Sequence, residues 1–76
     1  MKRMLRNVFN NETLLQIGAR IREARGKAKQ ADFAARIGIG RTVLANYEAG
    51  RRLPDSETID KIAYQADVST VYLLTG

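Results

Sequence analysis

The stretch QADFAARIGIGRTVLANYE, residues 30–48, decides the fold of this 76-residue chain. It reads as two short amphipathic helices joined by a tight turn at residues 38–40, because apolar residues recur at helical spacing on each side of that turn. The apolar residues are Phe33, Ala34 and Ile37 in the first half, and Val43, Leu44 and Tyr47 in the second. We therefore expect both helices to turn these faces toward a common core.

The second of these helices carries a polar face suited to contact with DNA bases. The residues opposite its apolar face are Arg41, Thr42, Ala45 and Asn46. Arginine donors fit guanine O6 and N7, an asparagine amide fits adenine N6 and N7, and Thr or Ala can meet a thymine methyl group. The alternative interpretation is a polar helix face that is only solvated.

Two glycines mark the turn between the helices. Gly38 falls where the first helix ends, at a position that favours a left-handed backbone. Gly40 falls at the N-cap of the second helix, where glycine is tolerated although it supplies no hydroxyl to the free N–H groups. Ala34 is small where the two helices have to approach closely.

These residues resemble the lambda-repressor/Cro-like (XRE) helix-turn-helix family. The family pattern has Gln at the start of the first motif helix, Ala four residues on, Gly eight residues on, and an apolar pair that closes the second helix. This chain carries that pattern at Gln30, Ala34, Gly38, Leu44 and Tyr47. Residues 48–54 are similar to the family's E-x-G-x-x-x-P exit, and the resemblance extends over residues 14–76. It implies a phage-repressor type of DNA-binding domain.

The whole chain predicts an all-α fold, a compact bundle of about five short helices that contains the helix-turn-helix. One proline, six glycines and no run of alternating β-branched residues favour helices throughout. The expected caps of the three remaining helices are Asn10 or Asn11, Asp55 or Ser56, and Ser69. The core-facing residues expected in the first two of these helices are Leu14, Ile17, Ile21, Ala24, Ile59, Ile62, Ala63 and Ala66.

Residues 1–9, MKRMLRNVF, form a basic and apolar extension before the helix-turn-helix domain, which we place at residues 10–76 with its motif at about 30–48. Two interpretations of the extension stay open. It could be a basic arm that follows the DNA backbone, or its apolar residues could pack on the body or on a second subunit. The candidate dimer patches are Met4, Leu5, Val8 and Phe9, or Val68, Val71, Tyr72 and Leu73.

The resemblance also implies a structural ion pair between Arg25, at the end of the first helix of the domain, and Glu48. Breaking such a pair when it is buried strands a charge, at a cost of about 3–5 kcal/mol. The chain departs from the family just after Arg25, because the connection to Gln30 is about two residues shorter than usual. Lys29 stands where the family commonly has Ser or Thr, and Lys29 cannot cap a helix.

The composition describes one small domain with an uneven charge. Residues 1–52 hold 12 Lys or Arg against four acids, which gives +8, whereas residues 53–76 hold one Lys against four acids, which gives −3. Positive charge gathered around a helix-turn-helix is expected of a nucleic-acid binder. No apolar run approaches the roughly 20 residues of a membrane span, and there is no cysteine. We therefore expect a cytoplasmic protein with no membrane partner, and the resemblance to phage repressors implies that the cell is a bacterial host.

The same composition argues against an enzyme. Without His or Cys there is no imidazole base, thiol nucleophile or ordinary zinc site. The carboxylates of Asp55, Glu57 and Asp60 look like one capped, solvated helix face. We expect no catalytic residue, no metal and no cofactor.

The resemblance assigns DNA contacts to two groups of residues. The base-reading group is Arg41, Thr42, Ala45 and Asn46. The phosphate-binding group is Gln30, Gly40, Arg51 and Arg52, helped by backbone N–H groups at the helix starts.

The predicted function is a sequence-specific DNA-binding transcriptional regulator, phage-repressor or Cro-like, that binds a palindromic operator as a homodimer. Its expected partner is double-stranded operator DNA, with RNA polymerase or a toxin as further candidates. Within DNA binding, the alternative is an antitoxin or a restriction-modification controller that uses the same domain. The alternative from a different class is a protein-interaction adaptor that does not bind DNA.

Overall fold

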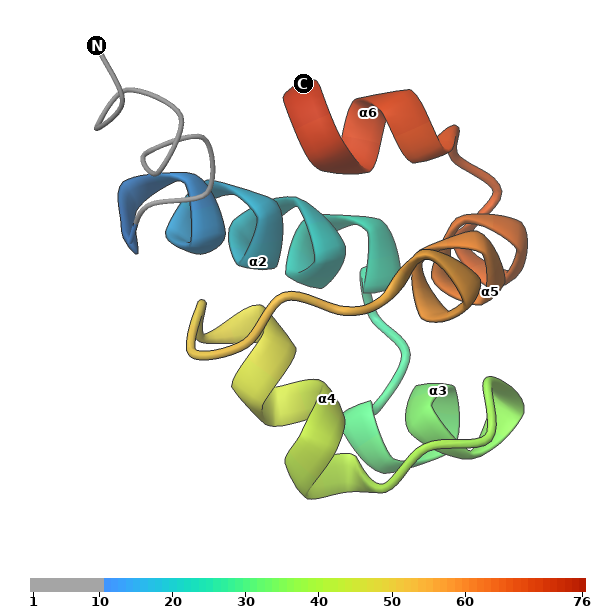
Figure 1. The fold of residues 1–76 in the computed structure, drawn as a ribbon. Coiled ribbons are helices and arrows are strands. Elements are labelled where there is room, and N and C mark those ends of the chain that lie inside the picture. The colour runs from blue at the N-terminus through green and yellow to red at the C-terminus, as the bar shows by residue number, and fades with distance from the viewer. Residues whose placement is uncertain (1–10) are drawn as a thin grey trace, which may run out of the picture.

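The computed structural model describes residues 11–76, which form a compact bundle of five helices without a strand (Figure 1). In chain order these helices are α2 (Asn11–Arg25), α3 (Gln30–Arg36), α4 (Arg41–Glu48), α5 (Ser56–Ala66) and α6 (Thr70–Thr75). The predicted all-α bundle with a helix-turn-helix is therefore confirmed. The extension at residues 1–9 and the possible cap Asn10 lie outside the described residues. Within residues 11–76, no helix has the length and apolar character that a membrane span requires.

All five helices contribute to one hydrophobic core. Its buried members are Ile17, Ile21, Phe33, Ala34, Ile37, Leu44, Tyr47, Ile59, Ile62, Ala63 and Leu73. Helix α2 is the central element, because it contacts α4 on one side and α5 and α6 on the other (Figure 1). Each fully buried Ile or Leu side chain stabilises the fold by about 1.5–3 kcal/mol relative to an exposed one. The predicted apolar faces of the two motif helices are those that enter this core.

The caps differ between the motif helices and the helices that follow them. Asp55 caps α5 by accepting a hydrogen bond from the Thr58 N–H at 2.8 Å, and the Ser69 hydroxyl accepts one from the Tyr72 N–H at 2.9 Å at the start of α6. Lys29 and Gly40 occupy the N-caps of α3 and α4 without a side-chain hydrogen bond. Helices α5 and α6 thus have side-chain caps at their N-termini, whereas the motif helices α3 and α4 have none.

One expectation about the C-terminus is wrong. Leu73 is fully buried in the core, so it cannot belong to an exposed dimer patch. Helix α6 is short, and one face lies against the core while the other faces the solvent. Val71, two residues before Leu73, is 67% exposed. The Arg20 guanidinium of α2 also donates to the Leu73 carbonyl oxygen at 3.4 Å, which ties α6 to α2.

The backbone of α2 packs directly against the backbone at the end of α4. A Cβ atom added at Gly18 would lie 2.5 Å from the Tyr47 carbonyl oxygen and 2.6 Å from the Glu48 carbonyl oxygen. This contact was not predicted from the sequence. The available signal was a single glycine inside the apolar stripe of a helix, which usually has a packing reason.

We predict that Gly18→Ala destabilises the domain. Alanine is the better helix former by about 1 kcal/mol, but the new methyl group overlaps backbone atoms that cannot rotate away. Overpacking costs about 1–3 kcal/mol, and an overlap with rigid backbone belongs at the upper end of that range. After the gain in propensity is subtracted, the free energy of unfolding in urea should fall by about 2 kcal/mol. Gly40→Ser is the control, because nothing lies within 4 Å of a Cβ there and only a few tenths of a kcal/mol are expected. Unchanged stability of Gly18→Ala would contradict the close approach.

The Asp55 cap predicts a pH effect. Hydrogen bonds from the Thr58 side chain and backbone N–H hold the pKa of Asp55 below its ordinary value of 3.8. A depressed pKa in the folded state adds stability above the unfolded pKa, and that stability is lost as the pH falls through the folded value. Asp55→Asn keeps an acceptor oxygen but does not titrate. Its stability should therefore fall less than that of the wild type between about pH 6 and about pH 2 in urea titrations, and an equal fall would show that the cap does not depend on charge.

Candidate nucleic-acid interface

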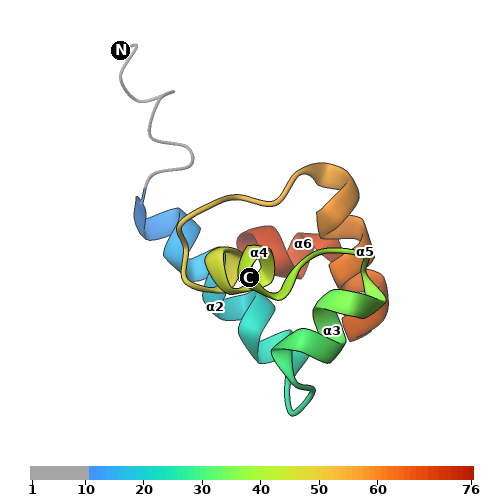
Figure 2. The same cartoon turned by 90° about the horizontal axis from the view of Figure 1, so that it is seen from below.

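The turn between α3 and α4 places the two motif helices at an angle (Figure 2). Gly38 has a left-handed backbone with φ of 77°, which lets the Ile39 N–H return to the Ala34 carbonyl oxygen at 3.0 Å. Gly40 is then extended and leaves the first N–H groups of α4 without a side-chain acceptor. Helix α4 thus starts with free donors at the positive end of its dipole.

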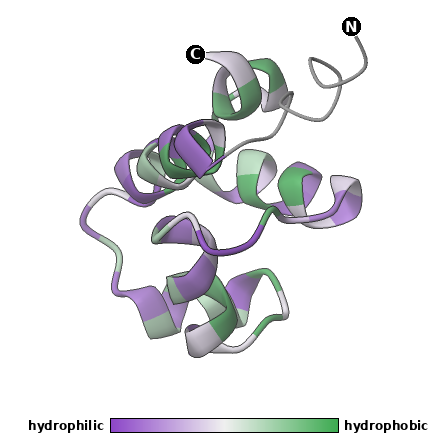
Figure 3. Ribbon diagram, turned by 60° about the vertical axis from the view of Figure 1, so that its left-hand side comes forward, coloured by the Kyte–Doolittle hydropathy of each residue, from purple (hydrophilic) through white to green (hydrophobic). Residues whose placement is uncertain are grey.

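Helix α4 has one buried and one accessible face. Leu44 and Tyr47 lie in the core, with exposed fractions of 0% and 8%. Arg41 and Thr42 are exposed, and Ala45 and Asn46 are partly exposed. Hydrophobic and hydrophilic residues are interspersed along the helices of the domain (Figure 3).

The Arg25 and Glu48 side chains form a bidentate ion pair between the ends of α2 and α4. Arg25 Nε lies 2.6 Å from Glu48 Oε2, and Arg25 Nη2 donates to Glu48 Oε1 at 2.9 Å. The side chains are 13% and 4% exposed. The hydrogen bonds to Glu48 raise the pKa of Arg25, against the opposing effect of burial. Arg25 also donates to the Ala28 carbonyl oxygen, so the pair fixes the connection from α2 to α3 as well.

Gln30 connects this ion pair to the accessible face of α4. Its Nε2 donates to Glu48 Oε1 at 2.9 Å, and its Oε1 accepts from Arg41 Nη1 at 3.2 Å. A carboxylate only accepts and a guanidinium only donates, so the two neighbours fix which end of the amide faces which. Gln30 was predicted from the sequence to lie near phosphate. Its hydrogen bonds to both Glu48 and Arg41 are a role that helical spacing alone does not reveal.

The loop after α4 folds back on the same helix. The Arg51 Nη1 donates to Asn46 Oδ1 at 3.1 Å. Arg52 is exposed next to it. The predicted base-reading and phosphate residues thus lie on three adjoining segments, which are the start of α3, helix α4 and the loop that follows. Among the described residues, no side-chain hydrogen bond links Thr42 or Arg52 to the rest of this group.

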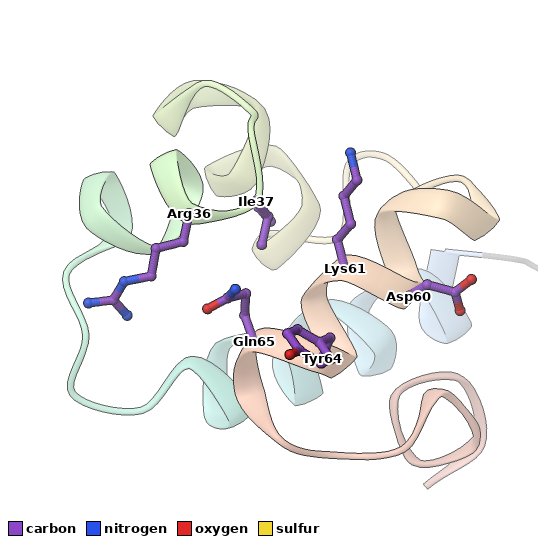
Figure 4. A pocket seen from close by; sticks show the side chains of 6 residues that line it. All are labelled: Arg36, Ile37, Asp60, Lys61, Tyr64 and Gln65. Carbon is purple, nitrogen blue, oxygen red and sulfur yellow. The ribbon is translucent and has the colours of Figure 1, made fainter.

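A shallow groove between α3 and α5 lies apart from this group (Figure 4). It is lined by Arg36, Ile37, Asp60, Lys61, Tyr64 and Gln65. Tyr64 is 83% exposed there. None of the residues predicted to contact DNA lines this groove, so it does not enlarge the candidate interface.

Known proteins match most of the described chain. A family model for the helix-turn-helix covers residues 19–73. The HTH-type transcriptional regulator ImmR of Bacillus subtilis (strain 168) is 42% identical over 62 residues, which are 79% of this chain and 49% of ImmR. The uncharacterized HTH-type transcriptional regulator YqaE of the same strain is 42% identical over 50 residues, which are 66% of this chain and 43% of YqaE. The chain spans about half the length of these curated relatives.

We predict that Glu48→Gln costs about 3 kcal/mol in the free energy of unfolding. The substitution keeps the shape of the side chain but leaves the Arg25 guanidinium, 13% exposed, without its countercharge. The measurement is urea denaturation at neutral pH.

The control is the double variant Arg25→Met/Glu48→Leu, which removes both charges together. Replacing a whole buried pair by apolar side chains is often neutral, so this variant should recover most of the lost stability. If Glu48→Gln is as stable as the wild type, the ion pair does not hold α4 in place.

Proposed function

This chain belongs to the helix-turn-helix family of transcriptional regulators, and from that premise we propose that it is a sequence-specific regulator that binds a palindromic DNA operator as a dimer. The family membership confirms the resemblance drawn from residues 30–48. The observation that carries the proposal is the accessible face of α4, where Arg41 is exposed at the start of the helix and Asn46 accepts a hydrogen bond from Arg51 of the following loop.

In the proposed complex, α4 enters the major groove and presents its accessible face to the base edges. Arg41 offers paired donors for guanine, and Asn46 offers an amide. Thr42 and Ala45 lie on the same face and suit a thymine methyl group. An α-helix fits the width of the major groove, which is how the second helix of this motif is used in general.

Phosphate contacts would flank this helix on both sides. Gln30 stands at the start of α3, and the N–H groups next to Gly40 begin α4, where the helix dipole favours an anion. Arg51 and Arg52 supply two exposed cations at the other end of α4. The net charge of +8 in residues 1–52 attracts the DNA backbone to this part of the chain.

Arg41 is held in place before DNA arrives. Its hydrogen bond to Gln30, which is itself held by Glu48, keeps the guanidinium over the start of α4. A side chain that is already ordered loses less conformational entropy on binding, by about 0.5–1.5 kcal/mol for a flexible residue. The partly buried ion pair would therefore support base reading through Gln30.

A dimer follows from the small footprint of one helix. One recognition helix covers only a few base pairs, so useful specificity needs two half-sites about 34 Å apart on one face of the duplex. Val71 remains an exposed member of the candidate dimer patch in α6. Bound across a promoter, such a dimer would regulate transcription by excluding or contacting RNA polymerase.

We predict that Arg41→Ala weakens binding to the operator about 5- to 100-fold and relaxes the preference at one base pair of each half-site, because a bidentate contact to guanine is lost. The operator would first be selected from a pool of random duplexes at near-physiological salt, and affinities would then be measured on it and on random DNA. Arg36→Ala removes the same charge from the last turn of α3 and should have a much smaller effect on both duplexes.

Equal loss on operator and random DNA would make Arg41 a phosphate contact rather than a base reader. Selection of no preferred sequence by the wild type would contradict the sequence-specific function, and the antitoxin and adaptor alternatives would then come first.

A further inference from the structure

We propose that Arg51 is a positioning residue that sets the base preference of Asn46, by holding the Asn46 amide with its NH2 group free for the base. This inference rests on the proposed function and concerns the same face of α4. It gives Arg51 a role in specificity in addition to the phosphate contact.

The backbone after α4 brings Arg51 to Asn46. Gly50 is left-handed with φ of 76°, and its N–H bonds the Tyr47 carbonyl oxygen at 3.1 Å. The Arg51 N–H bonds the Asn46 carbonyl oxygen at 2.9 Å. This is the pair of hydrogen bonds of a Schellman motif, in which the residue two after the helix C-cap lies against the third residue from the helix end. Asn46 and Arg51 occupy these two positions.

The loop is held in this conformation by α2. A Cβ atom at Gly50 would lie 2.8 Å from Leu15 Cα, so the turn packs directly on the α2 backbone. A side chain at residue 50 is thus opposed both by the left-handed backbone and by the contact. Arg51 consequently begins from a fixed backbone position.

The side chains complete the arrangement. Schellman motifs commonly place a hydrophobic contact between these two positions, whereas this chain places a hydrogen bond from Arg51 Nη1 to Asn46 Oδ1 at 3.1 Å. A guanidinium has donors only, so it can bond the amide oxygen but not the amide nitrogen. The contact therefore fixes the amide with Oδ1 toward Arg51 and Nδ2 away from it.

An amide fixed in this way reads a base differently from a free one. A free asparagine pairs with adenine by accepting from N6 and donating to N7. The amide oxygen keeps a second lone pair, but it is turned toward the Arg51 guanidinium, so Asn46 turns its NH2 donors toward the base. Guanine offers two acceptors, O6 and N7, on its major-groove edge. Asn46 is therefore expected to prefer guanine over adenine. Loss of the hydrogen bond from Arg51 should restore the preference for adenine.

Arg51 keeps enough donors for a second contact. One of its five N–H groups bonds Asn46, and the remaining ones are free for a phosphate oxygen. A phosphate bound there would hold the guanidinium beside Asn46 during base reading. The contact with the DNA phosphate and the base preference of Asn46 are in this way coupled through the Arg51 side chain.

The contact itself is tested without DNA. In nuclear magnetic resonance spectra of the free protein, the side-chain NH2 resonances of Asn46 should shift in Arg51→Ala and stay in place in Arg52→Ala. Arg52 is the matched control, since it is the neighbouring exposed arginine of the same loop and makes no hydrogen bond to Asn46. Unshifted Asn46 resonances in Arg51→Ala would overturn the proposal.

The effect on specificity is tested by selection from random duplexes with the wild type, Arg51→Ala, Arg51→Lys and Arg52→Ala. The wild type should select guanine at one position of each half-site. Arg51→Ala should lose about tenfold of the discrimination between guanine and adenine at that position and keep the rest of the sequence. Arg51→Lys, which retains a donor, should restore part of it.

Arg52→Ala should keep the selected sequence and bind more weakly, with a salt dependence reduced by about one charge. In an Asn46→Ala background, Arg51→Ala should cause only this kind of uniform loss. If Arg51→Ala behaves like Arg52→Ala in the wild-type background, Arg51 is a phosphate contact alone and the inference is wrong while the proposed function stands. If the wild type itself selects no sequence, the proposed function fails and this inference fails with it.

Discussion

The contact of α2 with the end of α4, through the middle and the last residue of α2, holds the domain together. At Gly18 the backbones of the two helices are in contact, and about two helical turns further along α2 the Arg25 and Glu48 side chains form their bidentate pair. The first contact sets how close α4 comes, and the second sets its direction. Core packing alone is less exact, because apolar side chains tolerate small shifts that a charged pair with fixed geometry does not.

Both ends of α4 are held by side chains outside the core. At its start, Gln30 is hydrogen-bonded both to Glu48 of the ion pair and to Arg41. At its end, the loop conformation at Gly50 brings Arg51 to Asn46. The accessible face is thus supported from a buried pair on one side and from a backbone motif on the other. This is how a helix of eight residues can present ordered polar groups.

The sequence predicted what depends on local periodicity. Of the contacts between distant residues described above, only the Arg25–Glu48 pair was expected, and it came from the family resemblance and not from a local pattern. Helical spacing placed Phe33 and Leu44 in the core, and Asp55 was among the caps that it indicated. Leu73 was assigned to the surface because a short apolar run such as VYLL has no clear periodicity. The bridging role of Gln30 depends on residues 11 and 18 positions away, which no local pattern contains. The roles of the accessible residues toward DNA stay predictions, because they depend on a partner.

The open N-termini of the motif helices have a consequence for engineering and for sequence drift. Asp55 and Ser69 close the helices that follow, whereas Lys29 and Gly40 leave the motif helices uncapped. A capping side chain contributes up to about 1 kcal/mol, so a search guided by thermal stability alone would install one at these two positions. In the proposed complex, the same hydroxyl or carboxylate would then occupy N–H groups that are needed for a phosphate. The domain is thus less stable at these positions than a capped one would be. Under the proposed function, variants selected only for heat resistance are expected to bind DNA more weakly.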